Sequence, residues 1–149
     1  MRHRFLSIVS LLFVALSAMA EGRAKYVFYF IGDGMGVNQV NTAENYLGAV
    51  DGRIGIGELC FASFPYSAYV TTFSALNVVT DSSAGGVALA SGQKTKNGAE
   101  GVLKDLVTPI TCIADWAHAS GAAVGIATSV TVDHATPAAF YAHVAHRSQ

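Results

Sequence analysis

Asp33 is the first residue of the chain whose type and surroundings suit metal chemistry. It follows the apolar run 26–31 and Gly32, and further glycines stand at positions 34 and 36. Glycine lets the backbone and a bound ion approach closely, and carboxylate oxygens bind hard or borderline divalent cations. A dinucleotide-binding turn is disfavoured, because that turn needs G-x-G-x-x-G and the carboxylate would repel the pyrophosphate. Two interpretations stay open at this point, a metal ligand and an Asx turn in which Asp33 bonds only local backbone.

A serine that can act as a nucleophile stands at the start of a predicted helix. Ser82 follows Asp81 and opens a stretch of small residues that predicts a helix over 82–92. The free N–H groups at a helix N-terminus favour phosphate and other anions, and a metal ion can activate a serine without a histidine partner. The alternatives are an ordinary helix cap and, on spacing alone, Ser83 as the nucleophile.

The third group combines a histidine and a threonine with an arginine further along the chain. His134 and Thr136 carry an imidazole and a hydroxyl that can bind a metal ion or support its ligands. Arg147 stands thirteen positions after His134, and its guanidinium can clamp two phosphate oxygens at once. A capping turn and a surface arginine are the structural alternatives. His143 and His146 are expected on a helix face without a role.

Apolar runs and helical patterns alternate along the chain. Continuous apolar runs predict buried strands at 26–31, 66–72 and 122–128. Helical patterns predict helices at 37–47, at 82–92, at 110–117 and from Thr136, with Thr136 as N-cap and Pro137 as the first helical residue. This alternation predicts an α/β fold with a largely parallel central sheet and helices on both faces. Ligands of such sheets bind beyond the carboxyl ends of the strands, near the three chemical segments.

Composition and charge fit one folded domain. Hydrophobic residues make up 52% of the 149 residues, charged residues make up 13%, and the formal net charge is −1. Such a chain can bury a core and is not typical of disorder. It also lacks the basic surface that nucleic-acid binding requires, so no nucleic-acid specificity is expected.

The first twenty residues have the pattern of a secretory signal peptide. Basic residues precede the apolar run 5–16, and Ala18-Met19-Ala20 predicts cleavage after Ala20. The alternative is a membrane anchor, which needs an apolar run of roughly 20 residues, so no stable membrane span is expected. Residues 21–149 are therefore expected to be secreted or periplasmic.

Two cysteines remain after this cleavage, Cys60 and Cys112. Export permits a disulfide, and two buried thiols are an equally good interpretation. A C-x-x-C pair is absent from the sequence, so a zinc or redox site built on cysteine is not supported.

The three chemical segments, taken together and in order, resemble the alkaline phosphatase family. The resemblance rests on Gly32-Asp33-Gly34-Met35-Gly36, on Thr80-Asp81-Ser82 with Ala84, and on His134-Ala135-Thr136-Pro137-Ala138 with Arg147 downstream. It extends over residues 25–147 and includes the linking pieces at 90–95, 97–98 and 142–144. The combination is far more specific than any one motif.

This resemblance implies hydrolysis of phosphate monoesters with two Zn²⁺ ions and one Mg²⁺ ion. Ser82 would bind zinc and form a phosphoserine intermediate, Arg147 would bind the non-bridging phosphate oxygens, and Asp81 would help to orient Arg147. Asp33 would lie between the magnesium and one zinc, and Thr136 would bind the magnesium.

His134 stands where the family has either Asp or His, near the magnesium. Imidazole prefers zinc and other borderline metals to magnesium, so a weaker or differently occupied magnesium site is expected than with Asp.

The family is longer than this sequence, and most of its zinc ligands lie in the later part. The chain is therefore expected to be the N-terminal part of an alkaline phosphatase-like domain, incomplete at its C-terminus, and not a working phosphatase by itself. A homodimer is an expectation for the complete protein. The alternatives are a related phosphodiesterase or sulfatase, although segment 82–86 lacks the C/S-x-P-x-R pattern of sulfatases, and a non-catalytic anion-binding fragment.

Overall fold

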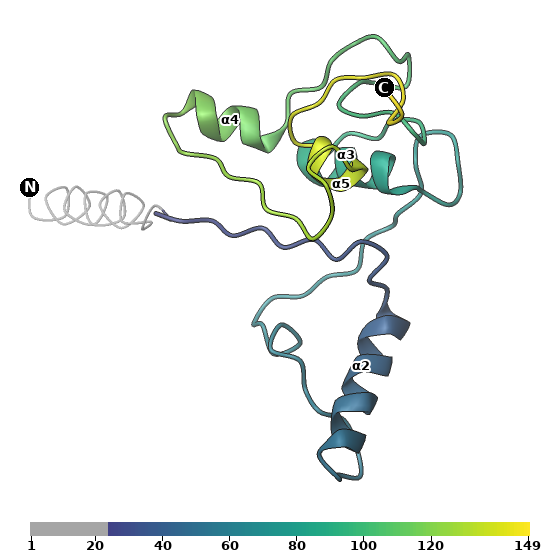
Figure 1. Ribbon diagram of the computed structural model, residues 1–149, viewed down its shortest axis with the longest axis vertical. Coiled ribbons are helices and arrows are strands. Elements are labelled where there is room, and N and C mark those ends of the chain that lie inside the picture. The colour runs from purple at the N-terminus through teal and green to yellow at the C-terminus, as the bar shows by residue number, and fades with distance from the viewer. Residues whose placement is uncertain (1–23) are drawn as a thin grey trace, which may run out of the picture. The chain divides into compact units, whose positions relative to one another are not determined.

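The computed structural model describes residues 24–149 and is shown in Figure 1. The predicted signal peptide lies outside the described residues. The described residues 24–31 belong to one compact unit, and Gly32–Gln149 form another. Within residues 24–149 the regular elements are the helices α2 (Val37–Val50), α3 (Ser82–Ser91), α4 (Ile113–Ala119) and α5 (Ala135–Ala138). None of these helices has the length and apolar character needed to cross a membrane.

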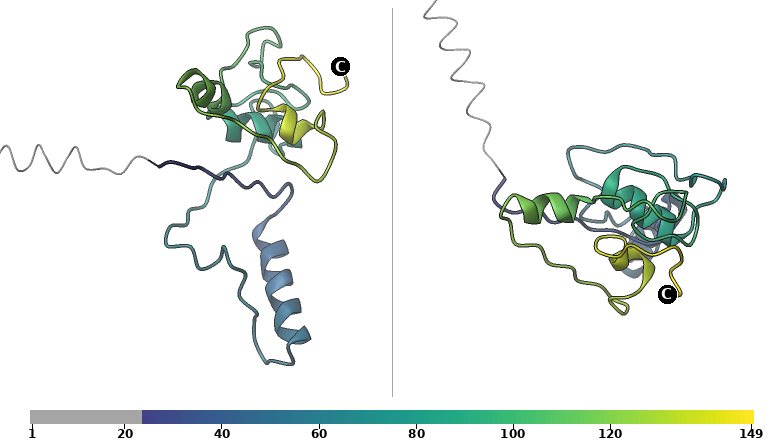
Figure 2. Two further views of the ribbon diagram at one scale, coloured as in Figure 1. Left: turned by 60° about the vertical axis from the view of Figure 1, so that its left-hand side comes forward. Right: turned by 90° about the horizontal axis from the view of Figure 1, so that it is seen from above.

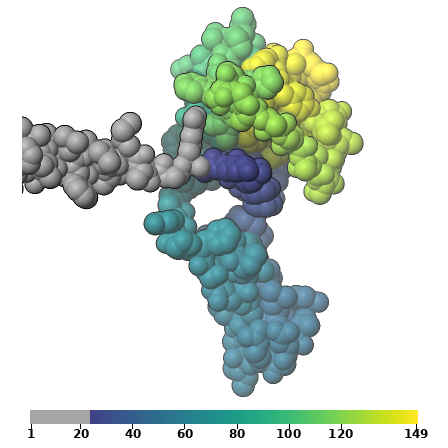
Figure 3. Space-filling view, turned by 90° about the vertical axis from the view of Figure 1, so that its left-hand side faces the viewer, coloured from purple at the N-terminus to yellow at the C-terminus, as the bar shows by residue number. Residues whose placement is uncertain are grey.

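Helix α2 is stabilised by the loop that follows it. The N–H of Gly57 donates to Glu44 O at 2.8 Å, and the N–H of Arg53 donates to Gly48 O at 2.9 Å. A Cβ atom at Gly48 would collide with the backbone of Gly55, so the loop lies directly on the helix. Figure 3 shows α2 and this loop as closely packed atoms.

The sequence predicted α3 almost residue for residue, because the signals at its ends are local. At the N-terminus, Asp81 Oδ1 accepts a hydrogen bond from the N–H of Ala84 at 2.9 Å, as a good N-cap does. At the C-terminus, Gly92 has a φ of 72°, a left-handed conformation that glycine adopts without steric cost. The helix forms even though two glycines lie inside it.

Helix α4 begins later than the sequence predicted. Cys112 is its N-cap, and the carboxylate of Asp115 accepts the N–H of Cys112 at 2.8 Å. Cys112 is buried, Cys60 is exposed, and both are free thiols. No disulfide therefore joins them, and only one of the two thiols is buried.

The predicted start of α5 was wrong by two positions. His134 is the N-cap of α5, and Thr136 lies inside the first turn. Because the first helical N–H groups have no partner within the helix, Pro137 is tolerated there. The helix is also short, so His143 and His146 lie in the segment after it and not on a helix face.

Helices α3 and α5 pack closely, as both views of Figure 2 show. A Cβ atom at Gly86 would lie only 2.9 Å from the Cβ of Ala139. Val87 of α3, Ile110 and Ala139 form a small buried core, with Leu103 and Phe140 packed against it. The small residues of α3 therefore allow the contact between the two helices.

The predicted strands are not paired within residues 24–149. The segments 26–31, 66–72 and 122–128 are neither helix nor strand. The prediction that they are buried was also wrong, since Phe28 is 79% exposed and Tyr69 is 92% exposed. A strand is stable only with hydrogen-bonded neighbours. The isolated bridges Glu100–Val144 and Val102–Pro109 do not extend into a sheet, so the central sheet stays a prediction.

The close approach of α3 and α5 yields a matched test on two adjacent glycines. Gly86→Ala is expected to lower the free energy of unfolding by about 1–2 kcal/mol, because the added methyl group is forced against Ala139. Gly85→Ala is the control, since its Cβ would meet only Thr80, at 3.6 Å, and alanine favours the helix by up to about 1 kcal/mol. Urea unfolding of both variants measures the difference. Equal stability of the two would contradict the proposed packing.

Candidate active site

Three segments that are distant in sequence meet at the carboxylate of Asp33. Its Oδ2 atom accepts a hydrogen bond from Ser82 Oγ at 2.9 Å, across 49 positions of sequence. The same atom accepts one from Thr136 Oγ1 at 3.2 Å, across 103 positions. Asp33 is exposed, and Ser82 and Thr136 are half-buried. The site is thus a partly open cluster of oxygen atoms at the beginning of α3 and of α5.

Asp81 connects the start of α3 to the segment that carries Arg147. One of its oxygens caps the helix, and the other, Oδ2, accepts the N–H of Gly98 at 2.7 Å. The carbonyl of Gly98 in turn accepts the N–H of Arg147 at 2.7 Å. Asp81 is therefore linked to the backbone of Arg147 through one residue. It stays a prediction that Asp81 also orients the guanidinium of Arg147.

The guanidinium of Arg147 lies beside His134. Arg147 Nη2 and His134 Nε2 are 3.4 Å apart. Arginine can only donate hydrogen bonds, so this contact requires an unprotonated Nε2 that accepts. The same lone pair would be needed to bind a metal ion. In this arrangement His134 therefore accepts from Arg147 and is not positioned as a metal ligand.

The oxygen cluster suits a hard cation better than it suits zinc. Asp33, Ser82 and Thr136 supply one carboxylate and two hydroxyl oxygens, which are the donor types that Mg²⁺ accepts. Zinc sites use at least three His, Cys, Asp or Glu ligands. Among residues 24–149 no three such side chains lie close enough to hold a metal ion together. The residues therefore fit part of a magnesium site and do not form a complete zinc site.

Sequence reasoning missed Glu100, which is almost completely buried. Its exposed fraction is 1%, and neither carboxyl oxygen has a hydrogen-bond partner among the described residues. Burial raises the pKa of Glu100 to about 7, while Ser83 and Arg147 lower it and Asp81 raises it further. The available signal was a single carboxylate within the otherwise small and apolar segment 98–102.

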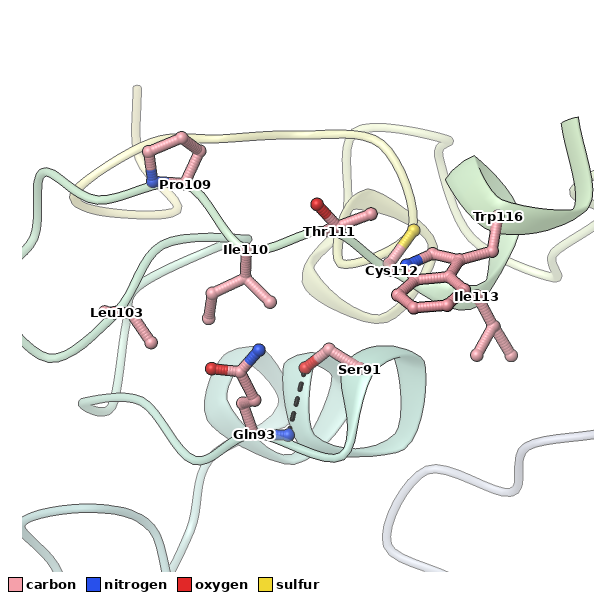
Figure 4. A pocket seen from close by; sticks show the side chains of 9 residues that line it. All are labelled: Ser91, Gln93, Leu103, Pro109, Ile110, Thr111, Cys112, Ile113 and Trp116. Atoms are coloured by element: carbon pink, nitrogen blue, oxygen red, sulfur yellow. Dashed lines mark hydrogen bonds between the residues drawn. The ribbon is translucent and has the colours of Figure 1, made fainter. Parts of the chain in front are cut away.

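A surface hollow of about 530 Å³ lies at the opposite end of α3 and is not part of this site. Figure 4 shows Trp116, Ile113 and Cys112 on one side of it and Ser91 and Gln93 on another. Ser82 and Ser91 are the two ends of α3, which are about 13 Å apart at 1.5 Å per residue. The hollow has no charged side chain in its lining, so it offers no side-chain charge to a phosphate group.

The sequence model of the alkaline phosphatase family matches residues 24–149. The chain belongs to the alkaline phosphatase family. The match includes all three segments that meet at Asp33 and Arg147, so the predicted family is confirmed.

Relatives and solved structures of the same family agree with this membership. The chain is similar to the alkaline phosphatase of Gadus morhua, with 33% identity over 90% of this chain and 30% of that protein. The crystal structure of a cold-active alkaline phosphatase from Shewanella sp. matches with a TM-score of 0.71 and 36% identity, over 79% of this chain and 29% of that one. The chain therefore spans less than a third of the length of these relatives, and its fold is alkaline phosphatase-like.

A third neighbour contains a metal ion. It is a mutant of the TAB5 alkaline phosphatase, with a histidine replaced by aspartate and Mg bound in the M3 site. It matches with a TM-score of 0.59 and 34% identity, over 62% of this chain and 26% of that one.

The buried carboxyl of Glu100 predicts that stability falls as the pH rises. Its pKa is raised in the folded state from 4.5 to about 7, so the folded state binds more protons than the unfolded state between these values. This group's contribution is present below its unfolded pKa and is lost as the pH rises through its folded pKa. In Glu100→Gln that contribution is absent. Urea midpoints of both proteins between about pH 5 and about pH 8 should diverge, with the variant gaining relative stability. A constant difference across this range would show that Glu100 does not titrate as stated.

Proposed function

We propose that the chain forms part of the active site of an alkaline phosphatase that hydrolyses phosphate monoesters through a phosphoserine at Ser82. One observation carries the proposal. The hydroxyls of Ser82 and Thr136 converge on one carboxylate oxygen of Asp33 at the N-terminus of α3. An ordinary helix cap would not require this convergence, because Asp81 already caps α3.

Ser82 is the proposed nucleophile because its oxygen is oriented and faces an anion-binding helix end. The hydrogen bond to Asp33 Oδ2 takes up the hydroxyl hydrogen and leaves the lone pairs of Oγ free for attack. Oγ would give its proton to Asp33 Oδ2 and form a bond to phosphorus, while the bond to the ester oxygen breaks and that oxygen takes up a proton from water and leaves as the alcohol. Water would then attack the phosphoserine and release inorganic phosphate. The positive end of α3 favours the phosphate oxygens throughout.

Arg147 is the proposed phosphate clamp. Its backbone is held by Gly98 O at 2.7 Å, and its guanidinium matches two phosphate oxygens in geometry. His134 and Asp81 are its proposed supports, one through the ring nitrogen and the other through Gly98.

Asp33, Ser82 and Thr136 are the residues of this chain that would hold metal ions, proposed as two Zn²⁺ and one Mg²⁺ for the complete site, and His134 would join them only where its Nε2 does not accept from Arg147. Bound metal would lower the pKa of the Ser82 hydroxyl and stabilise charge on the phosphoryl group. The zinc ligands that residues 24–149 lack are proposed to come from elsewhere in the complete protein. The chain alone is accordingly proposed to be inactive.

The exposed apolar segments support a larger assembled fold. Residues 26–31, 66–72 and 122–128 are proposed to become neighbouring strands of a largely parallel sheet once the rest of that sheet is present. Export by the predicted signal peptide, a secreted or periplasmic location and a homodimer of the complete protein are part of the same proposal. No nucleic-acid partner is proposed.

The decisive test is to trap the phosphoenzyme. With Ser82→Ala, the gene product that contains this chain should no longer acquire labelled phosphate from a phosphate monoester at low pH, because the attacking oxygen is gone. Ser83→Ala is the matched control and should still be labelled. Label that survives in Ser82→Ala, or that disappears only in Ser83→Ala, would overturn the assignment.

Arg147→Ala is expected to weaken inhibition by inorganic phosphate by about 10- to 100-fold, the effect of losing a charge-assisted pair of hydrogen bonds. Arg147→Lys should recover part of this loss, because charge returns without the bidentate geometry. Inhibition constants at one pH and salt concentration measure both effects. Unchanged inhibition in Arg147→Ala would make Arg147 a surface residue.

A further inference from the structure

The imidazole of His143 is bound to the backbone of a segment that is distant in sequence. Its Nδ1 atom lies 2.7 Å from the carbonyl oxygen of Gly101, across 42 positions of the chain. Because a carbonyl oxygen can only accept a hydrogen bond, Nδ1 must carry the hydrogen and donate it. The ring of His143 therefore ties its own segment to the one that contains Gly101.

This bond closes one end of a row of hydrogen bonds, and Arg147 lies at the other end. In the middle, the N–H of Glu100 donates to Val144 O at 3.0 Å, and the N–H of Val144 donates to Glu100 O at 2.9 Å, in antiparallel pairing. At the far end, the N–H of Arg147 donates to Gly98 O at 2.7 Å. Together with the bond of His143, these contacts hold the two segments side by side.

The two segments also touch closely at both ends of the row. A Cβ atom at Gly101 would collide with Ala142 O and would lie 2.8 Å from His143 Nδ1. At the other end, a Cβ atom at Gly98 would lie 2.9 Å from Cδ2 of His146. Side chains at these two positions would force the segments apart, so the pairing requires both glycines.

One of the paired segments is fixed relative to the proposed nucleophile. The N–H of Gly98 donates to Asp81 Oδ2 at 2.7 Å, and the other oxygen of Asp81 caps α3, whose first residue is Ser82. The row of hydrogen bonds extends this fixed position to Arg147. The bond of His143 is the one in the row that a side chain supplies, so it can be removed without changing the backbone.

We propose that His143 is a positioning residue of the phosphate site, which acts through Arg147 by holding the segment of the arginine against residues 98–101. The inference rests on the proposed function, in which Arg147 binds phosphate. Without the donor at Nδ1, the paired segments fray from the end at Gly101. The guanidinium then spends less time in the orientation that meets two phosphate oxygens at once, and phosphate is held less tightly.

The experiment measures the binding of inorganic phosphate to the complete protein by equilibrium dialysis, at one pH and one salt concentration. His143→Ala should bind phosphate about three- to tenfold more weakly than the wild type, the effect of one net hydrogen bond. His143→Asn should recover most of this loss, because its amide nitrogen donates from nearly the position of Nδ1. His118→Ala is the matched control, since it removes an exposed imidazole from α4, and it should bind phosphate like the wild type.

A double-variant cycle tests whether His143 acts through Arg147. In a protein that already carries Arg147→Ala, adding His143→Ala should weaken phosphate binding no further, because the group that His143 positions is gone. A merely structural role would lower the urea midpoint of His143→Ala and leave phosphate binding by the folded protein unchanged. His143→Leu, which fills the space of the ring without a donor, gives the same test if His143→Ala does not fold.

Three results would overturn the role of His143. They are phosphate binding equal to that of the wild type in the variants without a donor, no recovery in His143→Asn, and the same further loss in the Arg147→Ala protein. Unchanged phosphate binding in Arg147→Ala, together with a Ser82 that acquires no phosphate in the wild type, would instead overturn the proposed function. The two failures are therefore distinguishable.

Discussion

The close approach of α3 to α5 is the contact on which the site depends. Only a glycine at position 86 lets Ala139 come so near, and the small core around Val87 is built on that contact. The approach places the first turn of α5 beside the start of α3, which brings Thr136 within reach of the carboxylate that Ser82 also contacts. A larger side chain at position 86 would separate the two helix ends and with them the two hydroxyls.

The hydrogen bonds at Asp33 are too weak to determine this geometry by themselves. Asp33 is exposed, and a hydrogen bond contributes only about 0.5–1.5 kcal/mol net even in favourable surroundings. By contrast, Asp81 is engaged by two backbone N–H groups, one of α3 and one of Gly98. Packing and the hydrogen bonds of Asp81 therefore set the positions of α3, α5 and Arg147. The hydrogen bonds of Asp33 add to an arrangement that these contacts have already fixed.

The sequence predicted the helix boundaries and chemical segments that neighbouring residues determine. It did not predict the features that depend on residues distant in the chain. The boundaries of α3 follow from Asp81 and Gly92, and the three chemical segments were recognised from their own residues. The sheet could not form from apolar runs alone, because pairing needs strands that residues 24–149 do not supply. Thr136 was taken for a cap because its hydrogen bond to Asp33 spans 103 positions and leaves no local signal. Glu100 was missed because a lone buried carboxylate in a short segment of small and apolar residues leaves no periodic pattern.

The balance of charge explains why a phosphate site of this kind needs cations. Asp33, Asp81 and Glu100 are carboxyl groups of these segments and Arg147 carries the guanidinium, while the N-terminus of α3 adds only about half a positive charge. A phosphate dianion would be repelled if all three carboxyl groups kept their full charge. Asp81 is partly satisfied by backbone N–H groups, and burial raises the pKa of Glu100 to about 7. Asp33 has only two hydroxyl donors, so it is the carboxylate whose charge a bound metal ion would have to offset before phosphate can approach Ser82.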